Sequence, residues 1–492
     1  MTTARSRAEA EPLPALLDRL SGWSPEAGDL EAAWLRVADA ACAVRFGSSL
    51  AAWRSARRAF ARDSGAPAPW DGGGPGAPAG GTAAALAACC RITEVDDIEL
   101  ATCTTPGSVV VPAALATLPL AGAATHAPGG PDERGGDRFL AAVASGYEVV
   151  VGAAALLGGA FAPGAGVWPS RAVAALGAAA TAVAALGLTS EVSRHAVALA
   201  AAASFAGTFP EPARSWSLGM AVGCGVGAAL AAAEGLRGDV GLLARWPAGR
   251  YGEADPAQVA LVAGALANGT SAVRRSRLKP YAGARQVLAG SATLRALVEA
   301  GEVDPGDVAT ALLAVPGAHA RMVDRPLPEV RLDTLASAQY QLALALDAPR
   351  RLDELDHRLP PPASVAARMA AVHVVAEDPR TASAPAAPAA PAAAAARGTA
   401  GDGFPARWGA RLELVRNGSG RTCHVARSVP GEEAFGWEDV EGKARRLAAA
   451  NRESGIGAGE IDELLATVRR RDWGRLEDAL AAGAMCDEGG AR

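Results

Sequence analysis

Long stretches without a charged residue most constrain how this chain can fold. Residues 172–190 and 215–233 contain no Asp, Glu, Lys or Arg. They are long enough to cross a membrane, but they consist mainly of Ala and Gly rather than Leu, Ile and Phe, so they are poor membrane spans. We therefore expect helices buried inside a soluble protein. An apolar stripe at helical spacing runs along the first stretch: Val173, Leu176, Val183 and Leu186.

Three glycines recur at intervals of four residues in the second stretch: Gly219, Gly223 and Gly227. Each glycine disfavours a helix by about 1 kcal/mol relative to alanine. Three of them on one helix face predict that neighbouring backbones approach closely there.

The helical pattern covers most of the chain. We expect an all-α helical domain over residues 1–266, a smaller α+β domain over residues 267–430, and C-terminal helices over residues 431–492 that return to the first domain. The fold class is thus mostly α. In the last segment, the apolar residues of one helix face are Ile461, Leu464, Leu465 and Val468.

Local patterns within 267–430 predict its strands and helices. Residues 372–376 have the composition of a strand, and residues 411–416 and 422–425 flank an Asn-Gly-Ser-Gly turn, which predicts a β-hairpin. Residues 332–346 predict a helix with Asp333 as its cap.

Two segments are poor in core-forming residues. The Gly/Pro-rich residues 71–81 predict a loop, and the Ala/Pro tract 381–400 predicts a disordered insertion in the α+β domain.

Composition restricts the possible partners. The net charge is −5, and no cluster of Lys and Arg suits nucleic acid or an acidic membrane. No stretch near Met1 is apolar enough for a signal peptide, and the seven cysteines lack a regular pairing, so we expect free thiols and a cytoplasmic location. The six histidines lack metal-ligand spacing and no organic cofactor motif is present, so we expect neither a metal nor a cofactor.

Several motifs occur in an order that resembles the MmgE/PrpD family across about residues 16–447. Residues 84–97 read AALAACCRITEVDD, residues 105–108 read TPGS and residues 112–116 read PAALA. Further matches are FLAAV at 139–143, GYEV at 146–149, WPS at 168–170, RSWSLGMA at 214–221, KPY at 279–281, VDRP at 323–326 and SAQY at 337–340. Family members include methylcitrate dehydratase and cis-aconitate decarboxylase. The resemblance implies the same two-domain fold, a small carboxylate substrate, no cofactor and a homodimer.

The resemblance also implies where the active site lies. Glu94 stands at the position of the family's first Asp, with Asp96 and Asp97 beside it, so a carboxylate can serve as general acid or base. Arg214 replaces a Lys of the Gly-rich helix, and Lys279 retains the Lys that opens the lid domain. We therefore predict Lys279, Glu94, Asp96 and Asp97 as catalytic residues.

The remaining predicted residues would bind the substrate. Where the family has histidines, this chain has Arg91, Thr105 and Trp168; Met322 replaces a Tyr of the decarboxylases. The predicted substrate-binding set is Arg214, Arg91, Thr104, Thr105, Ser108, Trp168 and Met322.

The lysine content of the chain favours a working site. Only two lysines occur, Lys279 and Lys443, because Arg has replaced Lys almost everywhere. Lys279 survives at a motif position, and a lysine, unlike an arginine, can exchange a proton when it is desolvated.

Structural roles are alternatives for each residue. Lys279 could be an ordinary lysine, and Arg214 could pair with Glu211. The three acids could cap the following segment or bind basic neighbours. The Thr and Ser residues could be turn residues. Cys103 has no His partner and is more typical of a buried inert thiol than of a nucleophile, while Trp168 and Trp216 could line a pocket or pack in the core.

Three functions remain open. The first is a lyase or isomerase acting on a small carboxylate by dehydration, decarboxylation or epimerisation. The second is a tailoring enzyme of secondary metabolism with a larger, less polar substrate. The third is a non-catalytic descendant that binds a ligand or partner.

Overall fold

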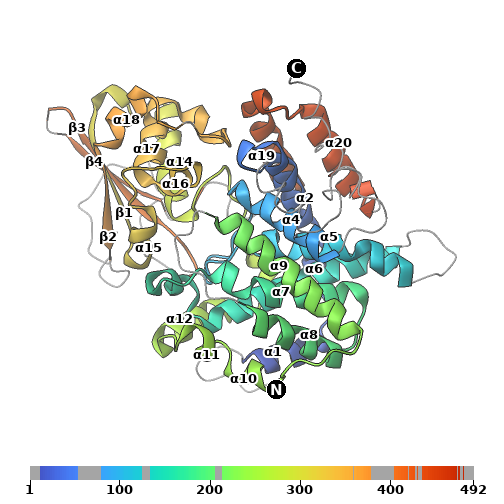
Figure 1. Ribbon diagram of the computed structural model, residues 1–492. Coiled ribbons are helices and arrows are strands. Elements are labelled where there is room, and N and C mark those ends of the chain that lie inside the picture. Colours follow the sequence, from blue (N-terminus) through green and yellow to red (C-terminus); the bar gives the residue numbers. More distant parts are fainter. Residues whose placement is uncertain are drawn as a thin grey trace. The chain divides into compact units, whose positions relative to one another are not determined.

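The chain forms two compact units in a computed structural model (Figure 1). The structure describes residues 12–53, 79–124, 133–204, 213–357, 359–377, 404–418, 420–426, 429, 435–473, 475–476 and 480. The first unit comprises Met1–Ala162, Gly166–Leu278 and Gly436–Arg492, and the second comprises Pro163–Ala165 and Lys279–Phe435. The chain thus enters the second unit at Lys279 and leaves it after Phe435, where the sequence suggested 267 and 430.

Helices build the first unit, as predicted. In chain order they are α1 (Leu13–Ser21), α2 (Ala27–Ser49), α4 (Ala79–Ile92), α5 (Gly107–Ala124), α6 (Glu133–Leu156), α7 (Pro169–Leu186), α8 (Ser190–Ala203), α9 (Arg214–Ala233), α10 (Gly241–Arg245), α11 (Ala248–Tyr251), α12 (Pro256–Leu266), α13 (Ala272–Arg275), α19 (Trp437–Ala450) and α20 (Ala458–Arg469).

Close backbone contacts explain the glycines of α9. A Cβ on Gly219 would lie 2.4 Å from the carbonyl oxygen of Ala84, and one on Gly223 would lie 2.6 Å from that of Gly80, so both glycines let α9 pack tightly against α4. The prediction is wrong for Gly227, whose Cβ would meet no atom within 4 Å. Gly225 has that role instead, because its Cβ would lie 2.2 Å from the carbonyl oxygen of Ala175 in α7.

Three helices in the described part of the chain are long and apolar enough to cross a membrane by length and composition. Within Asp137–Leu156 and Pro169–Leu186, 72% and 83% of the window is buried inside the protein, as expected for core helices. Only 44% of the window in Arg214–Ala233 is buried, so α9 leaves one face open.

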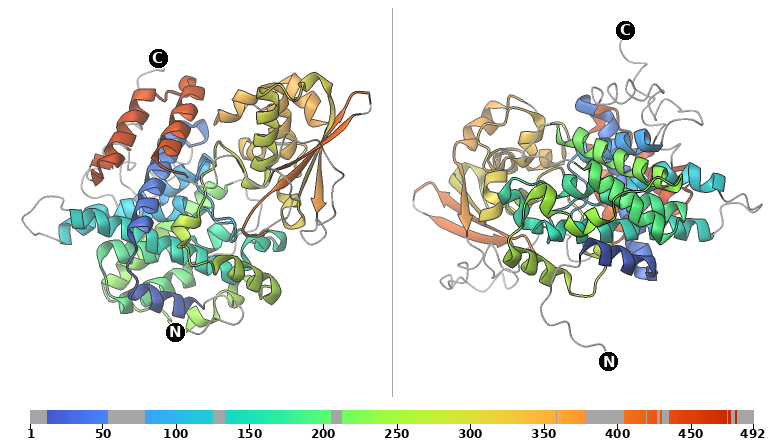
Figure 2. Two further views of the ribbon diagram at one scale, coloured as in Figure 1. Left: turned by 180° about the vertical axis from the view of Figure 1, so that it is seen from behind. Right: turned by 60° about the horizontal axis from the view of Figure 1, so that its bottom comes forward.

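The C-terminal helices pack on α2, as their apolar pattern predicts. The four apolar residues of α20 listed above are buried, and α19 and α20 both contact α2 (Figure 2). Trp437 at the start of α19 stacks on Trp34 of α2 with ring centroids 4.6 Å apart. Residues 437–469 therefore complete the core of the first unit.

The second unit is an α+β structure. Its sheet has the order β2-β1-β3-β4, formed by β1 (Val308–Pro316), β2 (Val372–Glu377), β3 (Ala410–Arg416) and β4 (Arg421–Ala426). β1 pairs with β2 in parallel and with β3 in antiparallel orientation, and β3 and β4 form the predicted hairpin. Its helices are α14 (Arg285–Glu299), α15 (Gly317–Val323), α16 (Arg331–Ala336), α17 (Ala338–Asp347) and α18 (Ala363–Met369). Ala410, Leu412 and Leu414 are buried in alternation, which matches a sheet covered by helices on one face (Figure 2).

Some local predictions need correction. The helix expected over 332–346 is broken at Ser337, whose hydroxyl caps α17. Asp333 lies inside α16, where its carboxylate caps the start of the helix, as predicted, by accepting from the backbone N–H of Val330 at 3.3 Å. β1 has no counterpart among the predicted strands. Residues 381–400 and most of the loop at 71–81 lie outside the described residues, while 79–81 belong to α4.

Candidate active site

The predicted acids lie in a buried loop that follows α4. We call residues 93–97 the acid loop. Glu94 has a φ of 60°, which places a non-glycine residue in the left-handed region. Such a conformation is uncommon and tends to occur where the surrounding structure enforces it, often at functional sites. It turns the chain sharply after α4, so Arg91 in the last turn of the helix faces the acids that follow it.

Two arginines hold the Glu94 carboxylate. Nη1 of Arg91 lies 2.7 Å from one oxygen of Glu94 and 2.9 Å from Oδ1 of Asp96. Nη2 of Arg214, the first residue of α9, donates to the other oxygen of Glu94. All four side chains are buried. The predicted pairing of Arg214 with Glu211 is not tested, because Glu211 lies outside the described residues; the described partner of Arg214 is Glu94.

Asp97 has structural contacts on both carboxylate oxygens. Its Oδ1 accepts a hydrogen bond from the backbone N–H of Gly107 at 2.8 Å. Its Oδ2 accepts from the hydroxyls of Tyr147 at 2.8 Å and Ser276 at 2.7 Å. Arg36 lies 3.7 Å from the same oxygen. Asp97 therefore ties the acid loop to α5, α6 and the segment after α13.

A lysine from α19 completes this set of charges. Nζ of Lys443 donates to Oδ1 of Asp39 at 2.6 Å and to the carbonyl oxygen of Val95 at 2.7 Å. We call the following buried side chains the charge cluster: Arg36, Asp39, Arg91, Glu94, Asp96, Asp97, Arg214 and Lys443. It contains four cations and four carboxylates, so its formal charge balances.

Burial shifts several pKa values in the charge cluster. Burial raises the pKa of Asp97 above its ordinary value, against the opposing effects of Arg36 and the hydrogen bonds from Ser276, Tyr147 and Gly107. Burial also raises the pKa of Asp39, which Lys443 opposes. For Arg91, burial acts to lower the pKa, but the carboxylates of Asp96 and Glu94 outweigh it and raise the pKa above the ordinary value. Arg91 therefore stays charged although it is buried.

The predicted Thr, Ser and Trp residues lie around the acid loop and at the start of α5 and α7. Thr104 pairs through its backbone with Glu99, and its hydroxyl lies 2.8 Å from that of Thr102. Thr105 donates its backbone N–H to Oγ of Ser170 at 3.0 Å, and its hydroxyl lies 3.2 Å from that of Ser108.

Trp168 is buried and meets one member of the charge cluster. The guanidinium carbon of Arg91 lies 5.6 Å from its ring centroid. Trp168 thus gives Arg91 an apolar, cation-binding wall.

Two predicted residues belong to the second unit. Lys279 is its first residue after Leu278, and its side chain is buried. The chain reaches it two residues after Arg277, whose backbone forms an antiparallel bridge with Ile98 (N···O 2.9 and 2.7 Å), next to the acid loop. Met322 in α15 is buried, and its sulfur accepts from the side-chain amide of Gln286 at 3.6 Å.

Two further residues can be assigned to the surface or the core. Trp216 is 43% exposed, so the prediction that it packs in the core is wrong. Cys103 is buried, as expected of a structural thiol, and has a φ of 55°.

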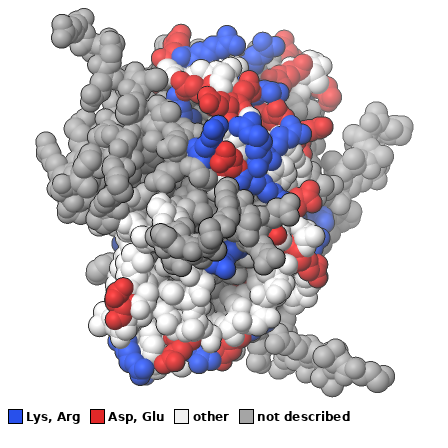
Figure 3. All heavy atoms as spheres, turned by 90° about the vertical axis from the view of Figure 1, so that its right-hand side faces the viewer, with Lys and Arg blue, Asp and Glu red and all other residues white. Residues whose placement is uncertain are grey.

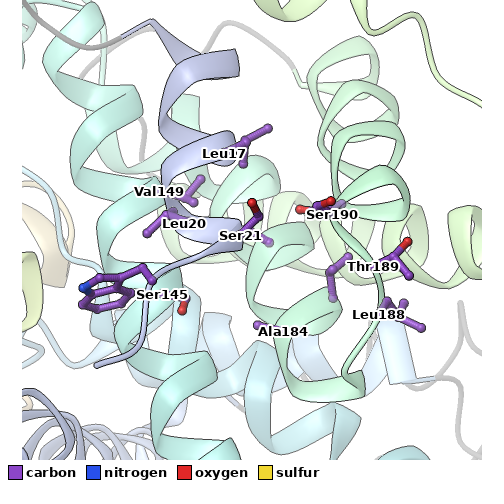
Figure 4. A pocket seen from close by; sticks show the side chains of 13 residues that line it. Leu17, Leu20, Ser21, Ser145, Val149, Ala184, Leu188, Thr189 and Ser190 are labelled. Atoms are coloured by element: carbon purple, nitrogen blue, oxygen red, sulfur yellow. The ribbon is translucent and has the colours of Figure 1, made fainter. Parts of the chain in front are cut away.

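A cavity of about 240 Å³ lies elsewhere in the first unit, between α1, α6, α7 and α8 (Figure 4). Its lining combines apolar residues such as Leu17, Val149 and Leu188 with hydroxyls such as Ser145 and Ser190. None of its lining residues is charged, and none is a predicted site residue. It therefore does not suit the carboxylate chemistry that the charge cluster suggests.

Charges are distributed differently inside and outside the protein. On the face shown in Figure 3, Lys and Arg are interspersed with Asp and Glu. The charge cluster is buried and adds nothing to this surface. Within the described residues, no group of three or more His, Cys, Asp or Glu side chains could hold a metal ion.

A family model matches the part of the sequence that contains most of the charge cluster. The family model for the MmgE/PrpD N-terminal domain matches residues 29–251, which span α2 to α11 and include the acid loop, Trp168 and Arg214. This match supports membership of the MmgE/PrpD family. No curated protein matches it. The mostly helical structure with a small four-stranded α+β unit confirms the expected fold class. Membership of the MmgE/PrpD family suggests a dehydratase- or lyase-type or related function.

Tertiary contacts add residues that were not predicted for the site of this protein: Arg36, Asp39, Gly107, Tyr147, Ser170, Ser276 and Lys443. For Lys443, the rarity of lysine in the chain was a usable signal. Gly107 and Ser170 lie in the motifs TPGS and WPS. Tyr147 lies in the motif GYEV, whereas for Arg36, Asp39 and Ser276 the sequence shows no comparable signal.

Proposed function

We propose that this protein is a lyase or isomerase that moves a proton at the carbon next to a carboxylate in a small carboxylic acid. Glu94 accepts the proton, and Arg91 and Arg214 bind the anion. The observation that carries the proposal is the geometry of Glu94, a buried carboxylate in a left-handed backbone conformation that two buried arginines hold.

Arg91 has capacity for another carboxylate. Its Nη1 serves Glu94 and Asp96, whereas its buried Nε has no hydrogen-bond partner within the described part of the chain. A buried donor without a partner is costly, and the planar guanidinium group suits a carboxylate. A substrate carboxylate at Nε would satisfy this donor, with the ring of Trp168 beside the same guanidinium.

The chemistry follows from the charge balance of the cluster. When Glu94 takes the proton, the C–H bond breaks, an O–H bond forms on Glu94, and the electron pair moves into the substrate carboxylate. Glu94 becomes neutral while negative charge grows on the substrate. The two arginines then interact more strongly with the substrate than with Glu94. Cations that interact more strongly with the transition state than with the ground state lower the barrier.

The fate of the electron pair distinguishes the possible reactions. Return of a proton on the opposite face gives epimerisation, and loss of a β-hydroxyl together with a proton gives dehydration. Loss of carbon dioxide in place of the first proton gives decarboxylation. We propose Lys279 as the proton donor on the strength of the family resemblance.

A non-catalytic ligand-binding protein is the second candidate. The charge cluster favours it in one respect: Glu94, Asp96, Asp97 and Asp39 each already have cation partners inside the protein. Such pairing is also typical of structural networks.

Proton NMR in deuterated water would test the proposal. Small carboxylates such as methylcitrate, citrate, cis-aconitate and amino diacids are incubated with the wild type, Glu94→Gln and Lys279→Ala. Glu99→Gln is the matched control, because Glu99 is also buried but bonds to Thr102. We expect turnover or deuterium uptake in the wild type and the control, and at least about 100-fold loss in Glu94→Gln.

Silence of the wild type across the panel would contradict the proposal for these substrates. In that case, binding without turnover would favour the second candidate. Equal activity of Glu94→Gln and the wild type would contradict the role of Glu94.

A further inference from the structure

We infer that Lys443, far from the acid loop in the sequence, is a positioning residue that holds this loop in its active shape. The catalytic meaning of this inference rests on the function proposed above, but the positioning itself can be tested without a substrate. The observation is a single buried ammonium group that donates both to Asp39 of α2 and to the carbonyl of Val95 within the acid loop.

The position of the Val95 carbonyl explains how this contact acts on the acid loop. The Val95 carbonyl belongs to the peptide group that joins Val95 to Asp96, directly after the left-handed residue Glu94. A hydrogen bond to it fixes the orientation of the peptide between the two acids that Arg91 binds. Rotation of this peptide would change the backbone torsions at Val95 and Asp96, and with them the direction of the Asp96 side chain.

The backbone at Val95 also has contacts close by in the sequence. The N–H of Val95 donates to Oγ1 of Thr93 at 3.3 Å, and that hydroxyl donates to the carbonyl of Cys90 at 2.7 Å. Both contacts lie within the loop and the end of α4. Lys443 adds to the long-range contacts of the Glu94 and Asp97 side chains one that acts on the loop backbone. It joins Val95 to α19 and, through Asp39, to α2.

The chemistry of the contact calls for a lysine. Of 47 basic Lys and Arg residues only two are lysines, and Lys443 is one of them. An ammonium is a compact charge that directs several donors from one atom, whereas a guanidinium spreads its donors over a rigid plane. Here one atom reaches two oxygens at 2.6 and 2.7 Å from two different segments.

The decisive variant removes the lysine without leaving a buried charge unpaired. Lys443→Met alone would leave Asp39 without this ammonium and could prevent folding, so Lys443→Met is combined with Asp39→Asn. Asp39→Asn alone keeps the ammonium and its bond to Val95. Leu447→Ala is the matched control for docking of α19, because Leu447 is buried one turn further along the same helix.

Hydrogen–deuterium exchange of residues 93–98 provides the first readout. The amides of Val95 and Ile98 have acceptors in Thr93 and Arg277, so they should be protected in the wild type. In Lys443→Met/Asp39→Asn we expect the Val95 amide to exchange at least about 10-fold faster, with other regions unchanged. Asp39→Asn and Leu447→Ala should leave it within about threefold of the wild type. Unchanged exchange in the double variant, or equal acceleration in Leu447→Ala, would overturn the inference.

Kinetics with a substrate identified by the NMR panel give the second readout. We expect kcat of the double variant to fall about 100-fold and KM to change less than about threefold, as for a misplaced catalytic group. A kcat equal to that of Leu447→Ala would overturn the inference. If every protein is silent while the Val95 amide is still loosened only in the double variant, the positioning stands and the proposed function fails.

Discussion

The backbone N–H of Gly107 donates to Oδ1 of Asp97 at 2.8 Å, and a Cβ on Gly107 would lie 2.6 Å from that same oxygen. The hydroxyl of Tyr147 would lie 3.0 Å from this Cβ. The glycine of the TPGS motif is therefore what lets the first turn of α5 approach the carboxylate. A carboxylate at a helix N-terminus is favoured by the helix dipole.

This contact predicts the effect of Gly107→Ala. The added methyl group must displace Asp97 or Tyr147, both of which are buried, so we expect the free energy of unfolding to fall by about 1–3 kcal/mol. Urea unfolding measures it. Gly442→Ala is the control, because a Cβ on this exposed glycine of α19 meets nothing within 4 Å. It should raise stability by about 0.5–1 kcal/mol. Equal stability of Gly107→Ala and the wild type would contradict the packing described here.

The Arg214–Glu94 pair predicts strong coupling. Arg214→Met removes one of the two cations of a buried carboxylate, so we expect a loss of about 3–5 kcal/mol in the free energy of unfolding. Arg214→Met/Glu94→Gln should lose less than the sum of the two single variants, by about 0.5–3 kcal/mol. Arg237→Met is the control, since Arg237 and Glu191 form an exposed pair with 76% and 71% exposed side chains. It should change stability by at most about 1 kcal/mol. Additive effects for Arg214 and Glu94 would argue against the pair.

His357 predicts a loss of stability in acid. Burial lowers the pKa of His357 to about 3, assisted by Arg331 and Arg351. Between this value and the ordinary pKa near 6.5, the unfolded chain binds a proton that the folded protein does not. Stability should therefore fall as the pH falls through this window, by up to about 1.4 kcal/mol for each pH unit.

Chemical unfolding between pH 7 and 4 tests this prediction. His357→Gln should lose less stability than the wild type over this range. His373→Gln, which changes an exposed histidine in β2, should follow the wild-type curve. Identical pH dependence of His357→Gln and the wild type would show that His357 is not buried in its neutral form.

The cysteines predict a simple pattern of thiol reactivity. Burial raises the pKa of Cys42 to about 12 and raises the pKa values of Cys89 and Cys90 well above the ordinary value. Cys423 in β4 is exposed. In a Cys486→Ser background, which removes a residue outside the described ones, a disulfide reagent should modify Cys423 first, and Cys423→Ser should abolish this fast phase. Rapid reaction of Cys89 or Cys90 in the native protein would contradict their burial.

Local patterns predicted the helices and the hairpin well, because their signals lie within a few turns of the chain. The Asn-Gly turn between β3 and β4 and the apolar face of α20 needed no distant residue. The break at Ser337 was missed because the apolar pattern of a helix continues across this residue. The capping hydroxyl of Ser337 does not interrupt that pattern. Strand β1 was missed because its sequence does not alternate between polar and apolar residues. Its last four residues are all buried.

By itself, the sequence determined the mostly helical class, the mixed second part and the motifs that contain Glu94, Asp96, Asp97 and Arg214. Hydrophobic periodicity and turn chemistry act between near neighbours, so they can be read along the chain. Only the tertiary structure decided which partners these residues have. Arg214 meets Glu94 over 120 residues, and Lys443 meets Val95 over 348 residues. Those contacts exist because packed helices bring distant charges into one buried volume, where each charge must find a partner to offset its desolvation.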